Sequence, residues 1–185
     1  RRLLPDGGRM LRLSGMTGPI PAARSRTGER VLLIAILWLA LGLRLHRLDA
    51  QSVWYDEAVT AQVAGQGLAE LTRWTADDIQ PPLYYYIVAG WTRWIGAGVS
   101  GVAPGGEWAL RFPSAVFGVL GVGFAWVVAR RLFRPLHIGR VAAAAAALLM
   151  AVSPLHVYYS QEARMYTLLV ALALLAGYTL MDLSR

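Results

Sequence analysis

The sequence predicts an all-α integral membrane protein, and three observations lead to this fold class. Of 185 residues, 56% are hydrophobic and the mean hydropathy is +0.45, which is too apolar for an ordinary soluble domain. The chain has 7 Trp and 8 Tyr, residues that concentrate at membrane interfaces. Basic residues cluster at the ends of the apolar runs, a pattern typical of spanning helices. We expect about four transmembrane helices and a long first loop that carries interfacial helices.

The charge of the chain is informative because its basic residues are all arginine. There are 18 of them against 11 acids, a net charge of +7. They do not form a polar stripe with interleaved aromatic residues, so we interpret the charge as membrane topology and expect no nucleic-acid partner. Arginine pairs bidentately with phosphate, so the composition is compatible with a phosphate-handling site. The absence of cysteine excludes disulfides, zinc sites of the cysteine type and a thiol nucleophile.

The first 48 residues indicate a basic tail followed by the first membrane-spanning helix. Residues 1–30 carry seven arginines and no apolar periodicity, so we expect a disordered, basic, cytoplasmic tail. The apolar run 31–43 lacks a small-residue cleavage site and is followed by basic residues from Arg44 on, which argues against a secretory signal. A spanning helix over about 30–48 is the prediction, with Arg44 and Arg47 reaching out to the far interface.

Residues 49–111 have the character of an exterior loop because acids outnumber bases there. Within this loop the pair Pro81-Pro82 predicts a helix start, since proline is tolerated in the first helical turn. The helix that follows is short, rich in Tyr and Trp, and carries Arg93 in its body. These properties favour an interfacial helix over one that crosses the bilayer.

The remaining segments give the topology. A clear span over 109–129 ends in the basic cluster 130–140, which the positive-inside rule places in the cytoplasm if the aromatic helix does not cross. A third span over 141–154 contains six consecutive alanines that permit close helix packing, and a fourth ends near residue 181. The first and last loops then share the exoplasmic face. We expect the membrane module of 31–185 to be the N-terminal part of a longer protein.

Two polar groups of residues lie on that face. Adjacent carboxylates at Asp56 and Glu57 are, taken alone, more typical of a solvated acidic pair. Glu162 and Arg164, at the mouth of a spanning helix, are equally compatible with an interfacial anchor. Together, at one membrane face and with an aromatic helix beside them, they suit a substrate with a lipid tail and a phosphate head.

Four segments carry a resemblance to a known family: Trp54-Tyr55-Asp56-Glu57-Ala58, Pro81-Pro82-Leu83-Tyr84-Tyr85, Leu110-Arg111-Phe112-Pro113-Ser114-Ala115, and Ser153-Pro154 through Tyr158-Tyr159-Ser160-Gln161-Glu162-Ala163-Arg164-Met165-Tyr166. In order and spacing, residues 30–183 resemble the N-terminal module of GT-C membrane glycosyltransferases. The closest branch is the family-39-like group, which includes protein O-mannosyltransferases and the aminoarabinose transferase of lipid A. The variable C-terminal part that helps to define acceptor specificity in the superfamily is missing here.

The resemblance implies an activity. A sugar moves from a polyprenyl-phosphate donor to a protein, lipid or glycan acceptor at the exoplasmic face of a prokaryotic-type cell membrane. The role of catalytic base falls on Asp56, with Glu57 beside it. Inverting transfer needs one base for the acceptor hydroxyl, while a phosphate leaving group departs without a dedicated acid.

The other implied roles concern the donor. Arg164 is expected to stabilise the charge that develops on the phosphate, and Glu162 to hold this arginine or a divalent metal such as Mg²⁺ or Mn²⁺. Metal use varies in the superfamily, and Asp56 and Glu162 are the candidate ligands. Three tyrosines are candidates to line the sugar or lipid site, although interfacial anchoring explains them equally well: Tyr84, Tyr85 and Tyr166.

Two other classes of protein are weighed against an enzyme. A transporter predicts charges near the middle of spans, and these spans carry almost none apart from their ends. A non-enzymatic membrane scaffold needs only the four spans. It predicts that Asp56→Asn is silent, whereas the enzyme predicts loss of transfer without loss of folding.

Overall fold

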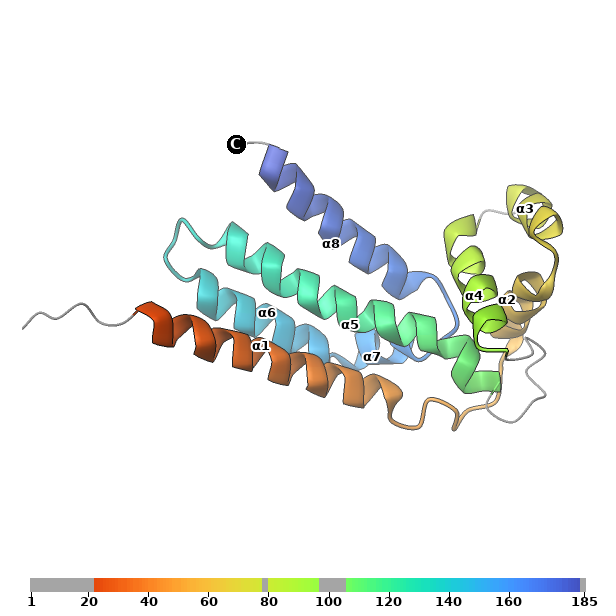
Figure 1. Cartoon of the computed structure of the whole chain (residues 1–185), viewed down its shortest axis with the longest axis horizontal. Coiled ribbons are helices and arrows are strands. Elements are labelled where there is room, and N and C mark those ends of the chain that lie inside the picture. The colour runs from red at the N-terminus through yellow and green to blue at the C-terminus, as the bar shows by residue number, and fades with distance from the viewer. Residues whose placement is uncertain (1–21, 78–79, 97–105, 184–185) are drawn as a thin grey trace, which may run out of the picture.

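The computed structural model describes residues 22–77, 80–96 and 106–183, with side chains from residue 27 on. Within these ranges every regular element is a helix (Figure 1): α1 (Ala22–Leu45), α2 (Tyr55–Gly65), α3 (Leu68–Asp77), α4 (Pro82–Trp94), α5 (Gly106–Leu132), α6 (Gly139–Val152), α7 (Pro154–Ser160) and α8 (Tyr166–Leu183). The predicted all-α class is confirmed. The predicted tail falls mostly on residues outside the described part, although α1 already begins at Ala22 instead of near residue 30.

The helices form a bundle with a cap at one end. The long helix α5 packs against α1, α6 and α8, and α1 also packs against α6. The three short helices α2, α3 and α4 gather at the end where α5 begins (Figure 1). The start of α1, the turn between α5 and α6, and the end of α8 lie at the opposite end. The predicted grouping of the loops into two sets, one at each end, is therefore present in the fold.

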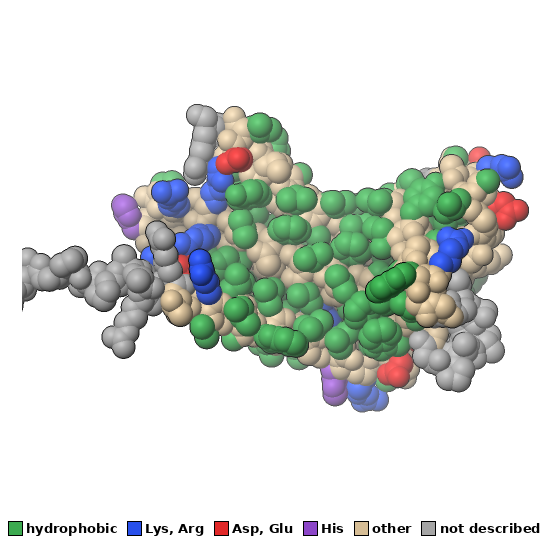
Figure 2. Space-filling view, viewed as in Figure 1, with side chains coloured by type: hydrophobic (Ala, Val, Ile, Leu, Met, Phe, Trp, Pro, Cys, Tyr) green, Lys and Arg blue, Asp and Glu red, His purple; other side chains and the backbone are tan. Residues whose placement is uncertain are grey.

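The bundle is suited to a bilayer. Helices α5 and α8 are each long and apolar enough to cross a membrane, and α6 with α7, bent by 60°, makes a third candidate span if the pair is counted as one. Thus two or three of the described helices meet these criteria, where about four spans were expected. Helix α1 contains the apolar run 31–43 and lies in the same bundle, but charged residues flank that run closely. Apolar side chains cover the middle of the flank seen in Figure 2, as expected for a lipid-facing surface.

The predicted start and short length of the aromatic helix are confirmed. Helix α4 begins at Pro82, as the double proline indicated, and has 13 residues. At 1.5 Å per residue this is about 20 Å, too short for a hydrocarbon core of about 30 Å. The helix lies with α2 and α3 in the cap, and the next helix starts at the same end of the bundle (Figure 1). This length and position agree with the predicted interfacial helix.

Small residues let the bundle helices approach closely. Ala143, Ala147 and Ala151 recur every four residues along α6 and are fully buried. They pack in one apolar cluster with Ala40 of α1 and Val122 of α5. The close contacts that the alanine run predicted are thus made, and van der Waals packing of this kind drives helix association in lipid.

A proline ties α4 to α5. Pro113 lies inside α5 and has no N–H, so the carbonyl of Ala109 one turn earlier loses its helical partner. The indole Nε1–H of Trp91 in α4 donates to that carbonyl at 2.9 Å. A backbone acceptor that the helix cannot satisfy is thus used to attach the cap to the bundle.

Arg44 differs from its prediction, because its side chain is fully buried and does not reach the interface. Among the described residues its N–H groups have only uncharged acceptors: Oγ of Ser160 at 3.2 Å, Nδ1 of His156 at 2.7 Å, and the carbonyls of Ala40, Met150 and Ala151 at 2.9, 3.3 and 3.2 Å. Gly118 of α5 leaves the necessary space, since a Cβ there would lie 2.8 Å from Nε of Arg44. A cation at the carbonyl end of α6 is favoured by the helix dipole.

Candidate active site

The first turn of α2 separates two adjacent carboxylates. Successive residues of a helix point about 100° apart, so Asp56 and Glu57 face different surroundings. The Asp56 side chain keeps 34% of its surface exposed, whereas that of Glu57 has none. Both benefit from the positive end of the helix dipole.

The buried carboxylate of Glu57 joins three parts of the fold. Arg111 of α5 donates to it from Nε at 2.8 Å and from Nη2 at 2.7 Å, a bidentate ion pair. The backbone N–H of Ala163, in the turn between α7 and α8, donates to the same carboxylate at 2.8 Å. Glu57 therefore fixes α2 against α5 and against the turn that carries Arg164.

Arg111 also holds the segment that precedes α2. Its Nη1 donates to the carbonyls of Leu48 and Gln51 at 2.9 and 2.8 Å, and its Nη2 donates to that of Ser52 at 3.3 Å. With the two bonds to Glu57, all five guanidinium N–H groups have a partner. This arginine, which is 3% exposed, therefore acts as a structural link with no donor left for a ligand.

Ser114 positions the backbone of Arg164. Its hydroxyl donates to the Arg164 carbonyl at 3.0 Å and accepts from the hydroxyl of Tyr84, 2.7 Å away. Thr167 of α8 donates to the Ser114 carbonyl at 2.9 Å. Burial raises the pKa of Tyr84, so its hydroxyl stays neutral and can donate. Arg111 thus holds α2 through Glu57, and Ser114 holds the turn that carries Arg164.

Asp56 and Arg164 meet although they lie 108 residues apart in the chain. Nη2 of Arg164 lies 3.5 Å from Oδ2 of Asp56. The arginine is only 7% exposed, and its Nε has no hydrogen-bond partner among the described residues. Its guanidinium carbon also lies 5.8 Å from the centre of the Tyr166 ring. The guanidinium is held in place and retains an unused donor.

A cavity of about 380 Å³ opens beside this ion pair. Its walls come from α2, α3, the segment before α4 and the turn before α8. The lining residues are Tyr55, Asp56, Val59, Gln62, Val63, Gln66, Trp74, Gln80 and Arg164. A carboxylate and a guanidinium thus face one concave space at the cap end of the bundle. In such a cavity the carboxylate can take a proton from a hydroxyl group, and the guanidinium can bind an anionic group.

The other predicted site residues lie elsewhere. Tyr84 and Tyr85 are each 1% exposed and belong to the packed core of the cap, not to the cavity wall. Glu162 is 7% exposed, and among the described residues no ion pair joins it to Arg164. Tyr166 contacts Arg164 as noted, and it is 38% exposed. The predicted roles of these four residues in donor binding remain predictions.

Several lining residues were not identified from the sequence. Three of them share one face of α2 at helical spacing, Tyr55, Val59 and Gln62, and Gln66 follows directly after the helix ends. That periodicity, starting beside Asp56, is the signal that could have identified them. Trp74 and Gln80 have no comparable signal, because only the fold of α3 against α4 brings them to the cavity.

The sequence analysis expected a divalent metal as a candidate cofactor, which would need a set of ligands among the described side chains. In the part of the chain that the structure describes, no group of three or more His, Asp or Glu side chains is placed to hold a metal ion. Asp56, one of the two candidate ligands, is paired with an arginine. The described residues around this cavity do not form a metal centre, so metal binding at Asp56 and Glu162 stays a prediction.

Comparison with known proteins shows the family of the chain. Residues 79–184, more than half of the chain, match the family described as dolichyl-phosphate-mannose-protein mannosyltransferase. The chain belongs to this family. It is therefore a mannosyltransferase-like membrane glycosyltransferase of the GT-C type, a family that uses a lipid-linked sugar donor. No curated protein and no solved structure matches the chain.

Proposed function

We propose that this glycosyltransferase moves a sugar from a polyprenyl-phosphate donor to an acceptor at the exoplasmic face, with inversion at the anomeric carbon. The observation that carries the proposal is the pair of Asp56 and Arg164, which come from distant motifs and face one cavity. A base for the acceptor and a cation for the leaving phosphate are the two groups that such a transfer needs.

Asp56 acts as the base. It accepts the proton of the acceptor hydroxyl as the oxygen attacks the anomeric carbon and the bond from that carbon to the phosphate oxygen breaks. The electron pair of that bond leaves with the lipid phosphate. Asp56 is suited to this role because its carboxylate is partly exposed in the cavity and is not buried in the fold.

Arg164 acts on the phosphate. Its Nε–H is unused, and the contact of its Nη2 with Asp56 is longer than an ordinary hydrogen bond, so a phosphate can take both donors. Ser114 holds the backbone of Arg164 and so limits the reorganisation that binding requires. Glu57 and Arg111 act as positioning residues, since they fix α2 and the turn without lining the cavity.

The test uses the full-length gene product and radiolabelled polyprenyl-phosphate sugars, mannose among them. Asp56→Asn keeps the size of the side chain but removes proton acceptance, so we expect kcat to fall by roughly a hundredfold or more with donor binding nearly unchanged. The control is Asp49→Asn, which alters an exposed aspartate outside the cavity and should keep full activity. Unchanged transfer by Asp56→Asn would favour a scaffold over an enzyme.

The proposed sidedness has its own test. In this proposal the cap carrying Asp56 is exoplasmic and the arginine-rich turn between α5 and α6, at the opposite end of the bundle, is cytoplasmic, as the positive-inside rule favours. Both Ser52 and His137 are exposed in the fold. In intact cells a membrane-impermeant thiol reagent should label Ser52→Cys and should label His137→Cys only after permeabilisation. The opposite pattern would invert the topology and place the active site in the cytoplasm.

A further inference from the structure

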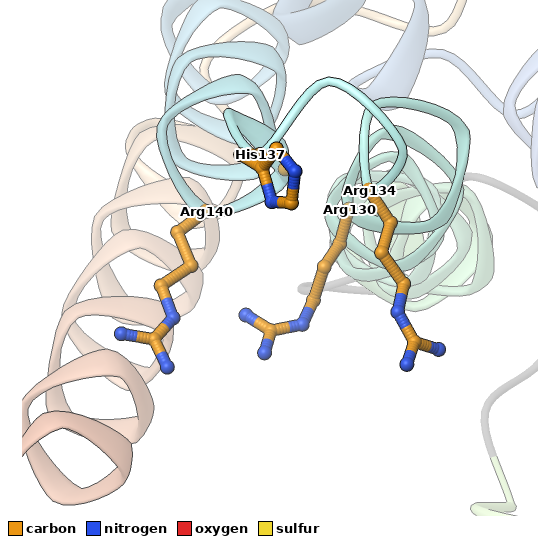
Figure 3. Close-up of a pocket in the computed structure, with 5 residues that line it drawn as sticks. Arg130, Arg134, His137 and Arg140 are labelled. Carbon is orange, nitrogen blue, oxygen red and sulfur yellow. The ribbon is translucent and has the colours of Figure 1, made fainter. Parts of the chain in front are cut away.

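A second polar cavity lies at the end of the bundle opposite Asp56. It has a volume of about 430 Å³ and is lined by Arg130, Arg134, His137, Gly139 and Arg140. In Figure 3 the three arginine side chains extend to the same side of the turn between α5 and α6, with His137 between the helices. The proposed transfer reaction uses none of these residues.

The backbone of the turn brings these arginines together. His137 adopts a left-handed conformation with φ of 59°, which reverses the chain after α5. Gly139 then begins α6 against α5, where a Cβ would lie 2.6 Å from the carbonyl oxygen of Arg130. A larger residue could not take this position without moving the backbone. Arg140 is therefore held next to the last turn of α5.

The cavity carries an excess of positive charge. Glu29 of α1 pairs with Arg130 and, at 3.7 Å, with Arg140. Three arginines and one glutamate leave a net charge of +2 (3 − 1). The side chains of Arg130 and Arg140 remain 41% and 59% exposed, and Arg134 is exposed with no ion pair among the described residues. Donors are therefore available to an anion from outside.

An apolar groove of about 600 Å³ adjoins this cavity and shares Arg140 with it. Its lining is mostly apolar and comes from three helices: Leu32 and Ile36 of α1, Trp126 of α5, and Val141, Ala144, Ala145 and Leu148 of α6. Gly28 and the charged residues Glu29 and Arg140 complete it. The groove runs along the flank of the bundle, where a bilayer supplies hydrocarbon. A basic pocket at the end of an apolar groove matches the shape and polarity of a lipid.

We propose that this site binds one anionic phospholipid of the adjacent leaflet, with the phosphate at Arg130, Arg134 and Arg140 and an acyl chain in the groove. Guanidinium groups bind phosphate through paired N–H donors, and basic pockets between spanning helices bind anionic headgroups. Free phosphate would satisfy the arginines but leave the groove unfilled. A zwitterionic lipid would fill the groove but would add no net charge to balance the +2.

The first test measures lipid retention and needs no turnover, so it is independent of the proposed function. The full-length protein is placed in nanodiscs of phosphatidylcholine with a small fraction of phosphatidylglycerol. The protein is then released from the nanodisc, and native mass spectrometry counts the lipids that stay bound to it. We expect one retained phosphatidylglycerol. Each arginine contributes about fivefold in affinity, so Arg134→Gln with Arg140→Gln should weaken binding by roughly 25-fold.

The charge-matched control is Arg47→Gln with Arg73→Gln, two exposed arginines outside the basic cavity. This variant should retain phosphatidylglycerol like the unaltered protein. An equal loss in both variants would show a general charge effect and overturn the proposal.

The second test blocks the groove without changing any charge. Ala145 is exposed and lines the groove, so Ala145→Trp should fill it and weaken phosphatidylglycerol binding by about tenfold or more. Leu149→Trp is the control, because this exposed residue on the same helix does not line the groove. If Ala145→Trp binds phosphatidylglycerol normally, or if millimolar inorganic phosphate displaces the lipid fully, the site recognises a free anion and the lipid proposal is wrong.

Discussion

The two faces of α2 carry similar ion pairs in different surroundings. On one face Asp56 meets Arg164 with a single contact of 3.5 Å beside a cavity. On the other face Glu57 meets Arg111 through two contacts of 2.8 and 2.7 Å in the interior. Asp56 thus belongs to the candidate active site, and its neighbour Glu57 belongs to the structural core. The difference between them is burial.

The physical difference lies in what each pair would lose if broken. A buried ion pair with every donor satisfied leaves an uncompensated charge when one partner is removed, which costs about 3–5 kcal/mol. A partly exposed pair with one long contact contributes about 1 kcal/mol or less. The first is fixed in one arrangement, whereas the second can exchange its partner for a substrate at little cost.

The largest expected effect is on stability at the buried face. Glu57→Ala removes the partner of Arg111 and the acceptor of the Ala163 N–H, so the free energy of unfolding should fall by about 3–5 kcal/mol. Denaturant titration of the detergent-solubilised protein, followed by tryptophan fluorescence, measures this change. Asp56→Ala is the matched control and should change stability by about 1 kcal/mol or less. Equal losses in the two variants would remove the distinction between the faces.

The next effect is on donor binding at the cavity face. Arg164→Ala should weaken the affinity for the polyprenyl-phosphate donor and also slow transfer, because the phosphate contact exists in the ground state and strengthens in the transition state. Arg164→Lys should restore both only in part, since an ammonium lacks the paired donors of a guanidinium. Donor titration and single-turnover rates separate the two quantities. Unchanged affinity and rate in Arg164→Ala would mean that the phosphate binds elsewhere.

The smallest effect concerns the connection between the faces. Tyr84→Phe removes one buried hydrogen bond to Ser114, whose hydroxyl still donates to the Arg164 carbonyl. We expect a loss of about 1 kcal/mol in the free energy of unfolding and little change in donor affinity. Thermal denaturation and donor titration measure these quantities. A large loss of donor affinity would show that Tyr84 acts on the site directly, as the sequence analysis proposed.

The sequence predicted the helices better than the partners of the charged residues. The apolar runs and the double proline located α4, α5, α6 and α8, because the length of an apolar run and the geometry of proline are local properties of the sequence. The environments of Asp56 and Glu57 could not be separated, since burial depends on where Arg111 and Arg164 fold. The sequence analysis expected Glu162 to hold Arg164, whereas in the fold Arg164 pairs with Asp56. This pairing likewise depends on the turn whose backbone Ser114 fixes.

Arg44 was misplaced for a related reason. Position at the end of an apolar run indicates an interfacial arginine, but the break between α6 and α7 supplies three of the five acceptors of Arg44. No pattern within α1 itself reports on residues so far along the chain. Local sequence therefore describes where a charge can be tolerated, and the tertiary fold decides whether it is buried.

The buried arginine has a consequence for how the protein is made. Its acceptors in α6 and α7 lie 106 to 116 residues further along the chain, so they do not exist when α1 first reaches the membrane during synthesis. An uncompensated guanidinium is costly in hydrocarbon, and until those residues arrive Arg44 has to stay in contact with water. Helix α1 therefore reaches the membrane before the residues of α6 and α7 that bury Arg44, and it takes its final depth only after they have been made.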